Sequence, residues 1–129
     1  VYAGLAAVDA LAEGWTQLPD TGPRLAATLA ALRFRIRYGG TGGALYRSLQ
    51  ARFLHDAAAL LGSAQLGQAA LVCDDLADAW RTLAATIGSE DPESAHRAGA
   101  GWVQRIRALE HEHVEALEQY LSIHRALAA

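Results

Sequence analysis

A run of apolar residues in the middle of the chain, spaced alternately three and four apart, constrains the fold more than any other feature. Its members are Leu66, Ala69, Cys73, Leu76, Trp80, Leu83 and Ile87. This spacing puts them all on one face of a helix, in the pattern of a seam that packs against other helices. The chain is therefore expected to contain a long central helix with helical neighbours.

Four other stretches also have helical periodicity, and short breaks rich in glycine, proline or polar residues separate them. They cover about residues 3–17, 23–38, 44–61 and 102–127, the last preceded by the start signal Asp91-Pro92-Glu93. Alanine and leucine dominate the 52% hydrophobic content, whereas residues that favour strands are scarce. The sequence therefore predicts an all-α fold, a five-helix and mostly antiparallel bundle.

Two finer predictions concern the packing of these helices. In the stretch 44–61 the apolar residues that align along one face are Tyr46, Leu49, Phe53, Ala57 and Leu60. We expect this face to be buried. We also expect Gly99 and Gly101 to interrupt or bend the last helix, because glycine is a poor helix former.

Length and charge narrow the class of protein. The 129 residues suit one domain over 1–129. The absence of methionine and the start at Val1 predict a fragment of a longer chain, with an N-terminal part absent. A net charge of −3 gives no overall basic field for nucleic acid, and no apolar run approaches the roughly 18 residues of a membrane span. A single cysteine favours a reducing, cytoplasmic setting.

Cys73 is the first candidate for chemistry, because a thiol beside a histidine can act as a nucleophile. It lies in the middle of the apolar seam, where a cysteine is usually a small core residue. Asp74 and Asp75 follow it, and their negative charges would raise the pKa of the thiol. We therefore expect Cys73 to be a core residue and no residue of this chain to be catalytic.

The segment Glu110-His111-Glu112-His113 is the second candidate, because Glu110 and His113 share a helix face. A Glu-x-x-His step is half of a di-iron carboxylate pattern, so a small metal-binding bundle of di-iron or hemerythrin-like type, with His55 as a further ligand, is an alternative function. No second Glu-x-x-His step exists. A solvated charged face with His113 at the edge of the core is the favoured interpretation, and we expect no metal or other cofactor.

His113 has another unusual property, since it belongs to a long stripe with a spacing of three and four. That stripe consists of Trp102, Ile106, Leu109, His113, Leu117, Tyr120, His124 and Leu127. His113 and His124 stand where apolar residues are expected. Either they pack against a polar partner, or the stripe faces another domain or a second copy; His113, His124 and Glu110 are thus candidates for an interface or pocket.

A glycine-rich break is the third candidate. It consists of Gly39, Gly40, Thr41, Gly42 and Gly43, with Arg37 before it and Arg47 after it. Backbone N–H groups at the start of the next helix, with two arginines nearby, could bind an anion or an anionic part of a substrate. A tight turn between two helices is the simpler interpretation, and the sequence favours it.

The stretch from Ile36 to Leu54, with its Gly-Thr-Gly-Gly turn and the following Tyr46, Arg47 and Phe53-Leu54, resembles a known family. It is similar to the helical domain of unknown function that follows the N-terminal domain of butirosin-biosynthesis-H-type proteins. In that family the N-terminal domain is papain-like and carries a Cys/His pair. The butirosin member is an acyltransferase that moves an aminoacyl group from a carrier-protein thioester to an aminoglycoside amine.

The resemblance implies that this chain is the helical accessory half of such a protein, since the Cys/His pair has no match in it. An accessory domain of this kind would shape the acceptor pocket, dock an acyl carrier protein or hold a dimer. The Gly39–Gly43 loop would then touch an anionic group such as a phosphopantetheine phosphate. A plain oligomerisation bundle that uses the stripe from Trp102 to Leu127 is the remaining alternative.

Overall fold

The computed structural model describes residues 5–18, 22–38, 44–88 and 91–128 of the chain. Those residues form five α-helices and one short 3-10 helix, and no strand occurs among them. The elements are α1 (Leu5–Gly14), η1 (Trp15–Gln17), α2 (Gly22–Tyr38), α3 (Ala44–Leu61), α4 (Ala64–Ile87) and α5 (Pro92–Ala128). The predicted all-α, five-helix architecture is confirmed.

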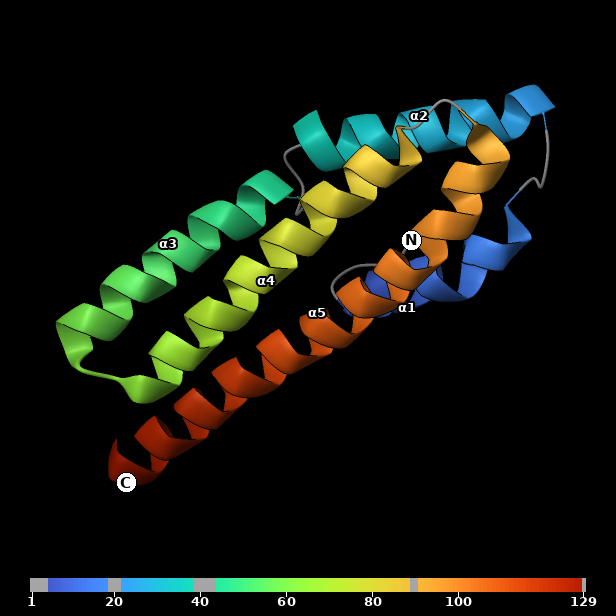
Figure 1. The fold of residues 1–129 in the computed structure, drawn as a ribbon. Coiled ribbons are helices and arrows are strands. Elements are labelled where there is room, and N and C mark those ends of the chain that lie inside the picture. The colour runs from blue at the N-terminus through green and yellow to red at the C-terminus, as the bar shows by residue number, and fades with distance from the viewer. Residues whose placement is uncertain (1–4, 19–21, 39–43, 89–90, 129) are drawn as a thin grey trace.

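The three longest helices form the body of the molecule (Figure 1). α4 lies between α3 and α5 and runs antiparallel to both, as the short connections between them require. α2 and α3 follow one another along the same side of α4, whereas α1 packs against α5. None of the helices, over the residues described, is long and apolar enough to cross a membrane.

Local signals in the sequence explain where α4 and α5 begin and where α3 ends. Gly62 has a φ of +60°, a left-handed conformation that favours glycine directly after a helix. The Ser63 hydroxyl then accepts a hydrogen bond from the Leu66 N–H at 3.2 Å and caps α4. Asp91 accepts one from the Ser94 N–H at 3.3 Å, immediately before Pro92 opens α5. The start of α5 at Asp91-Pro92 was predicted from the sequence.

The interior consists of two apolar clusters arranged along the bundle. The larger one joins α1, α2 and the C-terminal part of α4 to the first half of α5, with Trp15, Leu76, Leu83 and Ile106 among its members. The smaller one joins α3 to the N-terminal part of α4, and Leu117 and Tyr120 of α5 pack against it. All seven residues of the predicted α4 seam are buried in one cluster or the other.

The buried face of α3 differs from the prediction. Ala51 and Leu54 are buried, whereas Leu49, Phe53 and Leu60 are 59%, 69% and 86% exposed. The small side chains on the inner face let the backbone of α3 lie close to α4, whose facing residues Ala69 and Ala70 are also small. Because both faces of α3 have helical periodicity, spacing alone could not identify the inner one.

Gly99 and Gly101 do not interrupt α5, which is continuous through both. The first turns of α5 are nevertheless inclined to the remainder of the helix (Figure 1). Gly99 has a packing role, because a Cβ atom there would lie 2.7 Å from Cζ2 of Trp15 and 3.2 Å from Cγ2 of Ile87. Gly101 has nothing within 4 Å of that position.

The two glycines should therefore respond oppositely to alanine. We expect Gly99→Ala to lower the free energy of unfolding by about 1–3 kcal/mol, because Trp15 must shift within a packed cluster. We expect Gly101→Ala to raise it by about 0.5–1 kcal/mol, because alanine is the better helix former at an open position. Urea denaturation followed by circular dichroism measures both changes, and equal shifts in one direction would contradict this packing.

Candidate functional site

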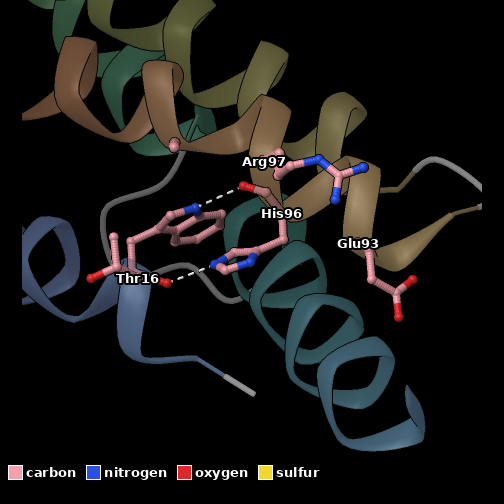
Figure 2. Close-up of a pocket in the computed structure, with 6 residues that line it drawn as sticks. Thr16, Glu93, His96 and Arg97 are labelled. Atoms are coloured by element: carbon pink, nitrogen blue, oxygen red, sulfur yellow. Dashed lines mark hydrogen bonds between the residues drawn. The ribbon is translucent and has the colours of Figure 1, made fainter. Parts of the chain in front are cut away.

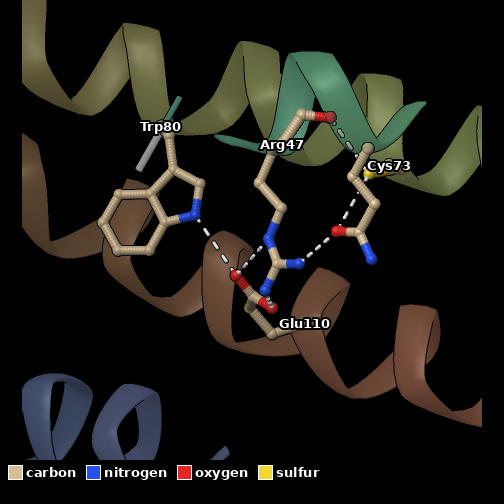
Figure 3. A network of polar contacts seen from close by, with 5 residues as sticks. Arg47, Cys73, Trp80 and Glu110 are labelled. Atoms are coloured by element: carbon tan, nitrogen blue, oxygen red, sulfur yellow. Dashed lines mark hydrogen bonds and ion pairs between the residues drawn. The ribbon is translucent and has the colours of Figure 1, made fainter. Parts of the chain in front are cut away.

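A charged pair between α3 and α5 is the most distinctive polar feature of the interior (Figure 3). Arg47 donates through Nη2 to Oε2 of Glu110 at 2.5 Å and through Nε to Oε1 at 3.2 Å. The Nε1–H of Trp80, on α4, donates to the same Oε1 at 3.3 Å. The Glu110 side chain is 4% exposed and the Arg47 side chain is 17% exposed, so this bidentate ion pair is mostly shielded from water.

Gln50 and Cys73 extend the contacts around Arg47 (Figure 3). The Oε1 atom of Gln50 accepts from Nη1 of Arg47 at 2.5 Å, and the Cys73 thiol donates to the Arg47 carbonyl oxygen at 3.2 Å. Burial raises the pKa of the Cys73 thiol to about 11, despite the nearby Arg47 charge. Cys73 is therefore a protonated core residue, as the seam pattern predicted, and it cannot supply a thiolate nucleophile near neutral pH.

His113 lies one helical turn beyond Glu110 and is 2% exposed. Neither of its ring nitrogens has a hydrogen-bond partner among the residues described. Burial and the positive charge of Arg47 lower the pKa of His113, and the approach of the Ala69 backbone carbonyl opposes them only weakly. The imidazole is therefore neutral and fully buried. The prediction that His113 lies at the edge of the core is wrong.

The favoured interpretation of Glu110 also fails. We expected a solvated face, but Glu110 is buried because Arg47 reaches across from α3 to neutralise it. His124 has a different environment, since it is exposed and its ring packs against that of Tyr120 with centroids 4.1 Å apart. Of the three candidates on α5, the structure brings Glu110 and His113 into one buried region and leaves His124 at the surface.

The metal ligands proposed as an alternative are not gathered. His55 lies on the surface, where its Nε2 is 2.6 Å from Oδ2 of Asp74, and Glu110 is bound by Arg47. Over the described ranges, no group of three or more His, Cys, Asp or Glu residues could hold an ion. Glu110 and His55 are thus occupied by protein partners, whereas the ring nitrogens of His113 have none among the described residues.

The glycine-rich candidate loop, residues 39–43, lies outside the described residues. Arg37, which precedes it, is exposed at the end of α2. Arg47, which follows it, has its guanidinium bound to Glu110 and Gln50. Anion binding by this loop stays a prediction, and Arg47 already has a partner inside the protein.

The charged pair lies where the two apolar clusters meet. On α3, Arg47 falls between Ala44 of the larger cluster and Ala51 of the smaller one. On α5, Glu110 and His113 fall between Leu109 of the larger cluster and Leu117, which packs against the smaller one. Arg47 and Glu110 are 63 residues apart, so their pairing was not visible in the sequence. A signal that could have indicated a buried acceptor is the Trp80 indole in the α4 seam, because a buried indole N–H usually has a hydrogen-bond partner.

A shallow pocket of about 450 Å³ lies elsewhere, where η1 meets the start of α5 (Figure 2). The residues that line it are Trp15, Thr16, Glu93, His96, Arg97 and Ala100. The Trp15 indole donates to the His96 carbonyl at 2.9 Å, and the His96 ring contacts the Trp15 carbonyl at 2.6 Å. Because a carbonyl only accepts, His96 carries its proton on Nε2. These reciprocal bonds connect η1 to α5.

Comparison with known families identifies the family of this chain. A family described as a domain of unknown function (DUF4872) matches residues 1–117. The chain belongs to this family. The curated proteins give no match to the chain, and the solved structures give none either. The family match includes Arg47, Trp80, Glu110 and His113 and ends before His124.

The buried ion pair makes the stability of this DUF4872 domain sensitive to the loss of Arg47. We expect Arg47→Met to lower the free energy of unfolding by about 3 kcal/mol or more, because it leaves the Glu110 carboxylate buried with only the Trp80 N–H as partner. Arg107→Met is the matched control, because Arg107 pairs with Asp9 at 2.9 Å but is 37% exposed. We expect it to cost less than about 1 kcal/mol. Urea unfolding compares the two, and equal losses would contradict a special role for Arg47.

His113 should make stability depend on pH. The folded protein lowers the pKa of His113, so the unfolded chain binds a proton more readily. The stability that neutral His113 contributes is therefore complete above pH 6.5, the ordinary pKa of histidine, and is lost as the pH falls below that value. Between pH 7.5 and pH 5 we expect the parent to lose stability that His113→Leu keeps. The unfolding free energy of the variant should therefore rise relative to that of the parent as the pH falls. A difference that is independent of pH in denaturant titrations would show that His113 titrates normally.

Proposed function

We propose that the chain is a non-catalytic helical accessory domain of an acyltransferase-like biosynthetic protein. The observation that carries this proposal is the state of Cys73, which is fully buried and has a thiol pKa of about 11. The other reactive-looking interior groups are Glu110, which is held by Arg47, and His113, whose ring nitrogens have no hydrogen-bond partner among the described residues. A domain of this kind contributes shape and surface, and the chemistry belongs to a neighbour.

The resemblance to butirosin-biosynthesis-H-type proteins supports the identity of that neighbour. In this proposal the partner is an N-terminal, papain-like domain of the same longer chain, with an acyl carrier protein delivering the acyl group. The helical domain would complete the acceptor pocket or receive the carrier protein. The single buried cysteine and the absence of any pairing for it favour a cytoplasmic setting.

A homo-oligomer is a second proposal, and the exposed end of α5 favours it. Leu121, Ile123 and Leu127 are 46%, 43% and 77% exposed there, next to the stacked Tyr120 and His124. Of the predicted stripe, His124 and Leu127 are exposed, whereas Ile106, Leu109 and His113 are buried in the bundle. No observation favours the metal-binding bundle, because two of its proposed ligands, Glu110 and His55, bind other side chains and no three candidate ligands are gathered among the described residues.

The accessory role predicts that acyl transfer survives the loss of Cys73. In the full-length protein, we expect Cys73→Ala to leave carrier-dependent transfer to an amine within about twofold of the parent, because a nucleophile's removal would cost many orders of magnitude. In this proposal the catalytic cysteine and histidine belong to the N-terminal, papain-like domain. Replacing that upstream cysteine by alanine is the matched comparison and should abolish transfer.

Two results would contradict the proposal. One is loss of transfer in a folded Cys73→Ala protein, which would make this thiol part of the reaction. The other is a coding sequence upstream of Val1 that lacks a cysteine at a helix start and a later histidine.

A further inference from the structure

The outer face of α3 is a stripe of large apolar side chains that are exposed to solvent. Tyr46, Leu49, Phe53 and Leu60, which we call the α3 outer face, are 49%, 59%, 69% and 86% exposed. Their spacing of three, four and seven keeps them on one side of the helix, opposite the buried Ala51 and Leu54. Isolated exposed apolar residues are common, but four large ones along one helix face are typical of an interaction surface.

Charge is distributed unevenly along the chain, and the α3 outer face lies in its basic part. Residues 22–61 contain six of the eleven arginines and one of the fourteen acidic residues, a net charge of +5. The remaining residues therefore carry −8, which gives the total of −3. Arg47 is neutralised by Glu110, but Arg35 and Arg37 on α2 and Arg52 on α3 are exposed. α2 and α3, the two helices of this basic segment, lie along the same side of α4 (Figure 1).

This combination argues against a second copy of the chain as the occupant. A symmetric dimer would place two α3 outer faces, each from a segment of charge +5, against one another. Like charges facing each other across an interface are unfavourable. Docking of the basic side of one copy on the acidic side of another would be an asymmetric contact, which does not close a dimer.

A membrane surface fits the α3 outer face poorly as well. Asp56 lies in the same row, between Phe53 and Leu60, and it is exposed. A carboxylate in the apolar row opposes insertion among lipid chains and is repelled by anionic headgroups. A protein partner can accommodate it, because a polar side chain can be placed opposite a single charge.

We propose that the α3 outer face docks an acidic amphipathic helix of another polypeptide. Apolar side chains of that helix would cover Leu49, Phe53 and Leu60, and glutamate or aspartate residues on its flanks would face Arg52 and the α2 arginines. Apolar contact supplies affinity in such a helix-on-face complex, and charge supplies specificity and speed of association. This inference goes beyond the accessory role, because it requires no catalytic neighbour.

The test uses two fluorescent 21-residue helical peptides with the same leucine row, one flanked by glutamate and the other by lysine. Fluorescence anisotropy should show at least about tenfold tighter binding of the glutamate peptide, and the affinity should fall as salt rises. Phe53→Asp and Arg52→Glu should each weaken binding about tenfold or more. Ala108→Asp, which adds a negative charge at an exposed position of α5, is the matched control and should bind like the parent.

Each variant is first shown by circular dichroism to unfold at the parent's temperature. The proposal is overturned if the glutamate peptide does not bind, if the lysine peptide binds equally well, or if Phe53→Asp binds like the parent. It is also overturned if sedimentation reveals a dimer that Phe53→Asp dissociates, which would identify a second copy as the occupant. Two other occupants have their own tests, each without peptide binding. Binding to phosphatidylserine vesicles that Phe53→Asp abolishes would identify a membrane as the partner, and binding to a single-stranded oligonucleotide that Phe53→Asp abolishes would identify a nucleic acid.

Discussion

The contact between Arg47 and Glu110 is the interaction on which the arrangement of the three long helices depends. It joins α3 to α5, and the Trp80 N–H brings α4 into the same contact. It also lies at the junction of the two apolar clusters, where a shift of one helix along another would separate the charges. Removing two charges from water is costly, so such a pair specifies the register of the helices more than it adds net stability.

Much of the architecture was predictable because it follows from local rules. The α4 seam needs only a spacing of three and four, and all seven of its residues are buried. The ends of the helices follow from single residues such as Gly62, Ser63 and Pro92, whose backbone preferences act without distant partners. The burial of Cys73 also followed, because its position in the seam left no alternative face.

Features that depend on distant contacts were not predictable. Spacing could not show which face of α3 is buried, because alanines on the inner side allow a close approach to α4 and leave Leu49 and Phe53 outside. Glu110 was expected in water because its partner is 63 residues away. The same two facts divide the molecule by role. Charged groups inside fix the helices, whereas apolar groups outside, on the α3 outer face, are available to another molecule.

A double-mutant cycle on Arg47 and Glu110 tests the central claim most directly. The cycle compares the urea unfolding of the parent, Arg47→Met, Glu110→Gln and the double variant. It gives the coupling free energy between the two side chains. Each single variant leaves one group buried without its partner, whereas the double variant leaves no unpaired charge. We therefore predict a coupling free energy of about 2 kcal/mol or more, and we expect the double variant to be more stable than Arg47→Met. A coupling near zero, with additive losses, would contradict the claim that this pair holds the three helices in register.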